Sequence, residues 1–335
     1  PTPEAASTTP DAPASIALPG PDADLPLATL TMSVGGMTCA SCVARVERAL
    51  DEWMPAQAPA GLGEVMRYAV QGGGKRLRPL LALAACEAVE GAPQAALRAA
   101  CAVELIHAYS LVHDDMPCMD NDVLRRGKPT VHVQFGQAQA LLAGDALQAL
   151  AFEILTPEPS AAASADMPAA MQAALCRLLA RAAGADGMAG GQAIDLASVG
   201  LPLTEPELRA MHRRKTGALL LASVRMGAAC AAHPLPAAAL QALDAYGQAL
   251  GLAFQVVDDV LDVTADSALL GKTAGKDAAA GKPTYVSLLG LEAARQLAAD
   301  LLAQAENALN ALQASGLAHT QPLHALARQV VQRQH

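Results

Sequence analysis

Residues 255–262 read QVVDDVLD, and they set polar side chains into an otherwise apolar stretch. Gln255, Asp258, Asp259 and Asp262 are spaced at i, i+3, i+4 and i+7, so they share one face of a helix. The intervening valines and leucine predict that this helix is buried. Because buried carboxylates need cations or a metal beside them, the stretch favours a helical bundle with a metal site inside it. A solvated acidic stripe is the alternative.

A second acidic cluster lies upstream, where residues 113–120 read HDDMPCMD. The residues before it suit a helix, but Pro117 lacks an N–H and cannot continue one. The chain must therefore turn, and the turn would bring Asp120 back toward Asp114. Carboxylate oxygens suit Mg²⁺, which is commonly shared with substrate phosphates. Together the clusters predict a cavity in which Mg²⁺ ions hold a polyphosphate; taken alone, the first cluster is also compatible with a surface loop.

The composition favours helices throughout. The chain has 335 residues, 53% of them hydrophobic and 2% aromatic, and it is rich in Ala and Leu, which are strong helix formers. We expect one large all-α domain over residues 42–335, a helical bundle around a central catalytic cavity. We expect residues 1–41 to be a disordered leader, since residues 1–28 are rich in Pro, Ala, Asp, Ser and Thr.

The charge and the cysteines narrow the range of functions. The net charge of −9 disfavours binding to nucleic acid or to an anionic membrane. The seven cysteines are scattered and odd in number, which favours a reducing cytoplasm over a disulfide framework. We expect no membrane insertion, because the most apolar run, residues 217–232, is short and is interrupted by Arg225.

The basic residues are few and are concentrated beside glycines. Residues 72–79 read GGGKRLRP and place Lys75 and Arg78 three residues apart, so that both can converge on one anion. The segment is not a P-loop, which requires Ser or Thr directly after the Lys. Residues 125–130 (RRGKPT) and 215–217 (KTG) are further candidate anion sites. Solvated surface cations are the alternative for each segment.

These motifs, in this order and spacing, resemble those of the trans-prenyl diphosphate synthases. The resemblance extends over residues 43–333 and rests on segments 73–79 (GGKRLRP), 107–115 (HAYSLVHDD), 124–127 (LRRG), 144–145 (GD), 190–192 (GGQ), 215–217 (KTG) and 255–262 (QVVDDVLD). It implies an all-α fold of the isoprenoid synthase type and a homodimer. The implied reaction is head-to-tail 1'-4 condensation of isopentenyl diphosphate with an allylic diphosphate.

The resemblance also implies a role for each candidate residue. Three Mg²⁺ ions would be held by Asp114, Asp120 and Asp258, with Asp115, Asp259 and Asp262 supporting those sites directly or through waters. The allylic diphosphate would be bound by Arg125, Lys215 and Lys272. Isopentenyl diphosphate would be bound by Lys75, Arg78, His107 and Arg126. The oxygens of Thr216 and Gln255 would face the developing carbocation.

Tyr109 and Ser110 are the expected chain-length residues. Tyr109 lies five residues before Asp114, which places it roughly 7.5 Å deeper along the same helix. In the family a bulky aromatic side chain here forms the floor of the pocket, and Ser110 beside it is small. We therefore expect a C15 product made from dimethylallyl diphosphate, with a C20 product as the alternative.

Residues 36–42 read GMTCASC and resemble the copper-site loop of a heavy-metal-associated domain. Two cysteines at this spacing, Cys39 and Cys42, can bind Cu(I) or Zn²⁺ through their thiolates. Such a domain needs a βαββαβ body, which the following sequence does not supply. We therefore expect Cys42–Met54 to be the first helix of the catalytic domain. A copper-binding module on an inactive synthase-like scaffold is the remote alternative.

Overall fold

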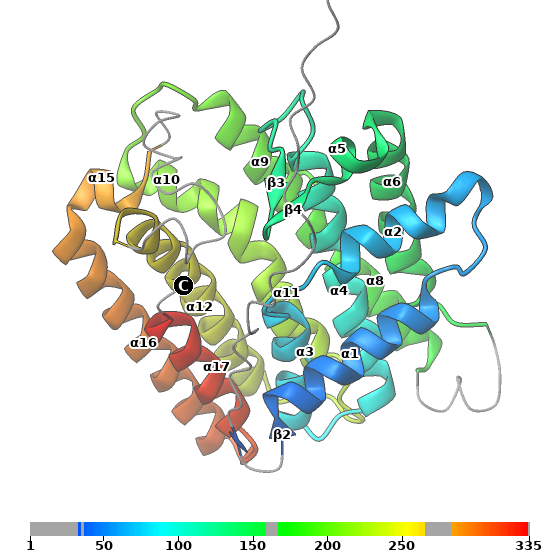
Figure 1. Cartoon of the computed structure of the whole chain (residues 1–335). Coiled ribbons are helices and arrows are strands. Elements are labelled where there is room, and N and C mark those ends of the chain that lie inside the picture. The colour runs from blue at the N-terminus through cyan, green and yellow to red at the C-terminus, as the bar shows by residue number, and fades with distance from the viewer. Residues whose placement is uncertain (1–32, 35–36, 159–166, 265–282, 334–335) are drawn as a thin grey trace, which may run out of the picture. The chain divides into compact units, whose positions relative to one another are not determined.

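The structure is a computed structural model of the chain, and it describes residues 33–34, 37–158, 167–264 and 283–333. Within these residues the protein is almost entirely helical (Figure 1). The first half of the chain forms α1 (Cys39–Trp53), η1 (Pro59–Gly61), α2 (Leu62–Gln71), α3 (Leu77–Ala88), α4 (Pro93–Asp114), α5 (Val131–Phe135) and α6 (Gln137–Glu153). The second half forms α8 (Ala169–Ala183), α9 (Met188–Ala197), α10 (Glu205–His212), η2 (Arg213–Gly217), α11 (Ala218–Ala228), α12 (Ala237–Thr264), α15 (Tyr285–Leu289), α16 (Leu291–Ala314) and α17 (Gln321–Gln332).

Two short antiparallel hairpins supply all the strands in the part of the chain that the structure describes. β1 (Ser33–Val34) pairs with β2 (Met37–Thr38) directly before α1, and β3 (Leu124–Arg125) pairs with β4 (Lys128–Pro129) after α4. The turn between β3 and β4 is formed by Arg126 and Gly127, whose φ angles of 53° and 74° suit a tight two-residue hairpin turn. The expected all-α fold is confirmed.

The central helices pack closely and bury most of their surface. α12 packs along α16, α4 packs along α6, and α3 packs against both α4 and α11 (Figure 1). Many of the fully buried positions are alanines, which let helix backbones approach one another. Among the described helices, α4 is the one with the length and apolar character of a membrane span. Because 72% of its most apolar window is buried inside the fold, it has the pattern of a core helix.

The first helix begins earlier than the sequence predicts, and α9 contains two adjacent glycines. α1 begins at Cys39 rather than at Cys42, and it ends at Trp53, before Pro55 as predicted. α8 ends at Ala183 and α9 begins at Met188, so Gly190 and Gly191 lie inside a helix. The reason is packing, since a Cβ on Gly191 would lie 2.5 Å from the Cα of Lys215 on η2. Glycine at such a contact permits close approach of two helices and does not end either of them.

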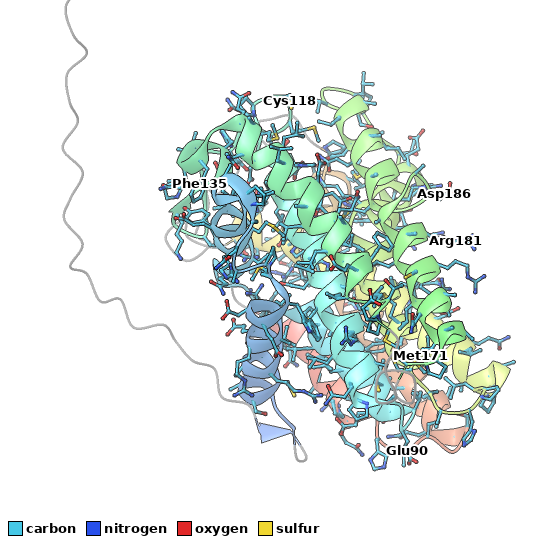
Figure 2. All side chains as sticks on the ribbon, turned by 90° about the vertical axis from the view of Figure 1, so that its right-hand side faces the viewer. Glu90, Cys118, Phe135, Met171, Arg181 and Asp186 are labelled. Carbon is cyan, nitrogen blue, oxygen red and sulfur yellow. The ribbon has the colours of Figure 1, made fainter. Side chains whose placement is uncertain are left out.

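The orientation of α4 places the first acidic cluster at one end of the bundle. Figure 2 shows Glu90, which precedes α4, and Cys118, which follows it, at opposite ends of this helix. Asp114 is the last residue of α4, so the carboxylates of the first cluster lie at the end marked by Cys118.

Candidate active site

The first acidic cluster forms where α4 ends. The backbone N–H of Asp120 donates to the carbonyl of Asp114 at 2.9 Å, so the chain returns on itself around Pro117. The turn expected from the proline is therefore present. It brings Asp114, Asp115 and Asp120 into one short segment, and the side chains of Asp114 and Asp120 are half-buried.

Asp115 is held by an arginine from the β3–β4 hairpin. The guanidinium of Arg125 donates to both carboxylate oxygens of Asp115, with contacts of 2.5 and 2.9 Å. Burial raises the pKa of Asp115, and the contact with Arg125 opposes that rise. Burial disfavours the charge of Arg125, but the hydrogen bond and charge of Asp115 outweigh it and raise the pKa of the arginine. Arg125 therefore stays positively charged beside the cluster.

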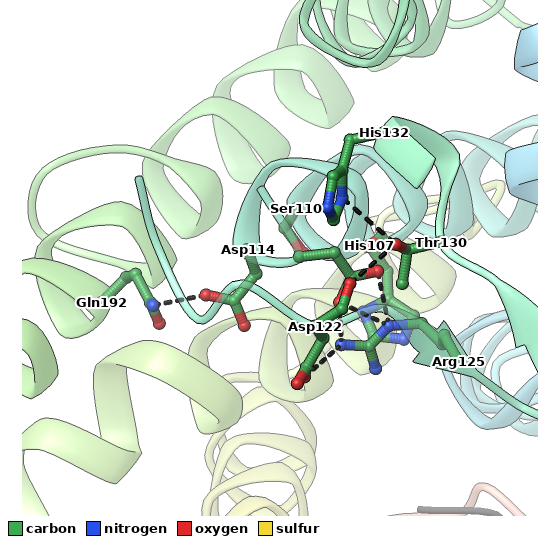
Figure 3. A network of polar contacts seen from close by, with 9 residues as sticks. His107, Ser110, Asp114, Asp122, Arg125, Thr130, His132 and Gln192 are labelled. Carbon is green, nitrogen blue, oxygen red and sulfur yellow. Dashed lines mark hydrogen bonds and ion pairs between the residues drawn. The ribbon is translucent and has the colours of Figure 1, made fainter. Parts of the chain in front are cut away.

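α9 and η2 connect the first cluster to the second. The side-chain amide of Gln192 on α9 donates to Asp114 at 2.5 Å (Figure 3). One turn later on α9, Asp195 accepts from the ammonium of Lys215 on η2 at 2.6 Å. η2 is a π-helical turn, a form that is frequent at functional sites. Lys215 on this turn contacts α9, and Thr216 contacts α12.

The second acidic cluster lies on α12, as the sequence predicts. The hydroxyl of Thr216 donates to Gln255 at 3.1 Å, and the amide of Gln255 donates to Asp259 at 2.8 Å. The other oxygen of Asp259 accepts from the backbone N–H of Tyr285 at 2.8 Å. Asp259 and Asp262 are buried, whereas Asp258 is half-exposed. Asp258 is therefore the carboxylate of this cluster that is most open to a ligand.

A cation near the C-terminal end of the described chain contacts Asp258. Arg333, which follows α17, lies 3.4 Å from an oxygen of Asp258 and donates to the carbonyl of Phe254 at 2.8 Å. Its guanidinium also stacks on the ring of Phe254, 4.1 Å from the ring centroid. Partial burial lowers the pKa of Lys75, as does the charge of Arg333, while Asp258 opposes the shift. Lys75 thus faces the second cluster.

The other predicted isopentenyl diphosphate residues gather around His107. Burial lowers the pKa of Arg78 to about 10, and the charge of Arg126 adds to this, so Arg78 remains protonated at neutral pH. Burial holds the pKa of His107 well below its usual range, and the charges of Arg78 and Arg126 add to the effect. A neutral imidazole beside several arginines can donate a hydrogen bond to an anion without adding to their mutual repulsion.

A buried ion pair between Arg76 and Glu104 lies next to this basic group. Arg76 donates to Glu104 on α4 at 2.7 Å and to the carbonyl of Val70 at 2.8 Å, and the side chains of Arg76 and Glu104 are 3% and 5% exposed. The guanidinium of Arg126 contacts the carbonyl of Gly73. Gly74 has a φ of 137°, and a Cβ there would meet Arg126 at 2.8 Å. Gly73 and Gly74 therefore allow the loop before Lys75 to pack closely against the side chain of Arg126.

Tyr109 and Ser110 lie on α4, N-terminal to the first cluster. Both are partly buried, and Tyr109 packs against the largest apolar cluster of the protein. The hydroxyl of Ser110 donates to the carbonyl of His107 at 2.8 Å, so its hydrogen bond lies within α4. Burial raises the pKa of Tyr109, opposed by a hydrogen bond with Gln148 on α6. The Tyr109 ring is therefore held between α4 and α6.

The donor set is suited to Mg²⁺. Within the described ranges, no group of three or more His, Cys, Asp or Glu side chains converges closely enough to hold a metal ion unaided. The candidate donors are carboxylate oxygens, however, and Mg²⁺ prefers such oxygens while keeping waters and binding substrate phosphates. The residues therefore fit an ion shared with a diphosphate better than a closed metal cage of protein ligands.

Two predictions fall outside what the structure describes. Lys272, predicted to bind the allylic diphosphate, lies outside the described residues, and so does the side chain of Cys39. Cys42, the other half of the predicted thiol pair, is partly buried on α1. The roles of both cysteines stay predictions.

Several residues of the site were not singled out from the sequence. Gln192 belongs to the glycine-rich motif at 190–192, but no role was assigned to it. Asp195 stands one helical turn after Gln192, which was an available signal for a shared face. Arg333 and the backbone N–H of Tyr285 gave no local signal, because their contacts with α12 span more than twenty residues of sequence.

Comparison with known proteins identifies relatives of the chain. The family described as Polyprenyl synthetase matches residues 59–315. A probable farnesyl diphosphate synthase of Sinorhizobium fredii is 53% identical over 269 residues, which are 79% of this chain and 79% of that protein. The large subunit 1 of a heterodimeric geranylgeranyl pyrophosphate synthase of Arabidopsis thaliana is 46% identical over 86% of this chain and 76% of its own length.

The fold is shared as well. A geranyltransferase of Helicobacter pylori, solved in complex with magnesium and isoprenyl diphosphate, matches with a TM-score of 0.77 at 34% identity. The match covers 88% of this chain and 97% of that one. The chain belongs to the polyprenyl synthetase family, as its motifs and its helical fold predict.

Proposed function

We propose that the chain is a (2E,6E)-farnesyl diphosphate synthase, which condenses isopentenyl diphosphate with dimethylallyl diphosphate and then with geranyl diphosphate. The observation that carries the proposal is the set of contacts joining the two acidic clusters. It runs from Asp114 to α9, from α9 through Lys215 to η2, and from Thr216 to α12. Relatives named as farnesyl diphosphate synthases, which are 52% and 53% identical, support the choice of product.

The two diphosphates would occupy different groups of cations. Arg125 and Lys215 lie beside Asp115 and Asp195, next to the acidic clusters, and would bind the allylic diphosphate together with Lys272. Arg78, Arg126 and His107 lie near one another and would bind isopentenyl diphosphate together with Lys75. Separate anion sites are what a two-substrate condensation requires.

The reaction begins with loss of the leaving group. The C1–O bond of the allylic diphosphate breaks, and its electron pair leaves with the diphosphate. The resulting carbocation bonds through C1 to C4 of isopentenyl diphosphate, and a proton from C2 of that unit passes to the released diphosphate. The oxygens of Thr216 and Gln255 would face the cation, and their hydrogen bond fixes their positions. Water must be excluded, because it would convert the cation into an alcohol.

Mg²⁺ would be held by Asp114, Asp120 and Asp258, as three ions per site in our proposal. When bound, it neutralises the charge that develops on the leaving diphosphate. Asp115 and Asp259 are already bonded to protein donors, to Arg125 and to Tyr285 and Gln255 respectively. We therefore assign to Asp115, Asp259 and Asp262 the support of those sites, directly or through waters.

A geranylgeranyl diphosphate synthase is the second candidate. It is favoured by relatives with that activity in their names, at 43–47% identity. The position of Tyr109 argues for the shorter product, because an aromatic ring at that depth on α4 blocks a chain that grows along the helix from the cluster at Asp114. The two candidates differ only in how far the chain can extend.

One assay tests the proposed function and its rivals. The enzyme is given Mg²⁺ and dimethylallyl diphosphate, with and without isopentenyl diphosphate, and released diphosphate is measured. We expect release only when both substrates are present, and chromatography of the dephosphorylated products should give farnesol. Release from the allylic substrate alone would identify a terpene cyclase and contradict the proposal. No release at all, with tight Cu(I) binding lost on Cys39→Ser and Cys42→Ser, would favour the copper module.

We further propose a cytoplasmic homodimer. Exposed apolar side chains on α5 and α6, namely Val133, Leu141 and Leu142, support this, because a second copy would cover them. Five cysteines among the described residues are free thiols, as a reducing compartment would leave them, namely Cys86, Cys101, Cys118, Cys176 and Cys230. Light scattering of the purified protein, which should give twice the mass of one chain, tests the assembly.

A further inference from the structure

Tyr109 on α4 is in contact with a second aromatic ring. His113 follows it by four residues, so both side chains lie on the same face of α4. Their rings meet edge to face, with centroids 5.7 Å apart and planes at 76°. This geometry is the favourable one for two aromatic rings, and it restricts how the Tyr109 ring can turn.

α6 holds His113 in turn. The Nε2–H of His113 donates to the carbonyl of Leu141 at 3.1 Å. A Cβ on Gly144 would lie 2.5 and 2.7 Å from the Cδ2 and Cε1 atoms of the His113 ring, far inside normal contact distance. The His113 ring therefore occupies the space that a side chain at position 144 would need. Any larger residue at 144 would displace the imidazole.

The same stripe of α6 also reaches Tyr109. Leu141, Gly144 and Gln148 are spaced at i, i+3 and i+7, so they share one face of α6. Gln148 is close enough to Tyr109 to oppose the rise of its pKa. The two rings on α4, which contact each other, thus lie against one face of α6.

We propose that His113 and Gly144 determine product length by holding Tyr109 across the path of the growing chain. His113 is in this view a positioning residue that acts through Tyr109, and Gly144 provides the space that His113 needs. The inference rests on the proposed function, in which the allylic chain extends from the cluster at Asp114 toward Tyr109. A tyrosine on a helix has few allowed rotamers, so a single lateral contact is enough to select among them.

The first test is a double-substitution cycle on the ratio of C20 to C15 product. The variants are Tyr109→Ala, His113→Ala and the pair together, each assayed at equal conversion. We expect His113→Ala to raise the ratio about tenfold, the range that small changes in an apolar pocket produce. In the Tyr109→Ala enzyme, which already makes longer products, adding His113→Ala should change the ratio less than about twofold. His319→Ala, an exposed histidine beside Glu90, is the matched control and should leave the ratio unchanged.

His113 adjoins Asp114, so His113→Ala could inactivate the enzyme and leave no product to measure. A second variant therefore tests the inference independently. Gly144→Ala keeps the histidine but removes its space, so it should also raise the C20 fraction. In the enzyme that already carries His113→Ala, adding Gly144→Ala should not change the ratio of C20 to C15 product further. An unchanged ratio in both His113→Ala and Gly144→Ala, with Tyr109→Ala making C20, would overturn this inference and leave the proposed function standing. A wild-type enzyme that makes no C15 product would instead overturn the proposed function.

Discussion

Asp114 lies at the last residue of α4, where the chain leaves the helix, whereas Asp258 lies inside α12, which runs unbroken from Ala237 to Thr264. The carboxylates of the first cluster therefore depend on a turn around Pro117 and on a hairpin that brings Arg125. Those of the second are placed by the helix itself. One acidic cluster is thus built on a continuous helix, and the other on a turn and a hairpin that follow a helix.

The protein partners of the two clusters also differ. Asp114 accepts from the neutral amide of Gln192, while Asp258 faces the cation of Arg333. Asp115 is paired with a side chain that is 34% exposed, whereas Asp259 accepts from a backbone N–H within the fold. Removal of Asp115 should thus affect substrate binding, whereas removal of Asp259 should affect folding stability.

The largest expected effect comes from neutralising either open carboxylate. Asp114→Ala and Asp258→Ala should each lower turnover by about a thousandfold or more, because charge neutralisation of the leaving group supplies much of the barrier reduction. Steady-state assays of diphosphate release measure this, with circular dichroism to show that both variants fold. Near-normal turnover in Asp258→Ala would contradict the assignment of the second cluster.

Substitution of the supporting carboxylates, Asp115 and Asp259, should show the difference between the two clusters most clearly. Asp259→Ala leaves the buried N–H of Tyr285 without its acceptor, which should lower the free energy of unfolding by about 1–3 kcal/mol. Asp115→Ala leaves Arg125 partly solvated, so the loss of stability should be about 1 kcal/mol or less, while the KM for the allylic substrate changes. Urea denaturation and KM measurements on the same two proteins test the contrast. Equal losses of stability would remove the distinction between the clusters.

A histidine beside the second cluster should make stability depend on pH. Burial lowers the pKa of His212 to about 4, from about 6.5 in an unfolded chain. Between these values the unfolded chain binds a proton that the folded protein does not, so stability falls as pH is lowered from 6.5 to 4, by about 3 kcal/mol at most.

His212→Gln should reduce that pH dependence, measured as the free energy of unfolding at pH 6.5 and pH 4.5. Part of it should remain, because burial also lowers the pKa of His107 beside the first cluster. The matched variant His107→Gln should remove that second part. An identical pH dependence in the wild type and in both variants would show that neither histidine is buried in its neutral form.

The smallest effect is expected from the partners of the open carboxylates. In the proposed function Arg333 would compete with a metal ion for Asp258. Arg333→Gln should therefore lower the Mg²⁺ concentration for half-maximal activity by about threefold, as expected for a partly screened ion pair. Gln192→Ala removes a neutral partner and should leave that concentration nearly unchanged. A titration of activity with Mg²⁺ compares the two. A rise in the requirement for Arg333→Gln would show that the arginine assists metal binding.

The sequence was sufficient for the features set by local pattern. The spacing of Gln255, Asp258, Asp259 and Asp262 predicted a shared helix face, and Pro117 predicted the turn after α4. The contacts of Arg333 and Tyr285 with α12 were beyond such patterns, because they depend on how distant helices pack.

The π-helical turn at η2 has a consequence for helical phase. A π turn accommodates more residues than an α turn, so it shifts the angular register between α10 before it and α11 behind it. If residues 213–217 took ordinary α-helical geometry with no residue removed, every later side chain of α11 would rotate by about 100°. Ser223 and Met226, now fully buried, would leave the core. The register of one buried helix therefore depends on the same turn that directs Lys215 and Thr216 toward different partners.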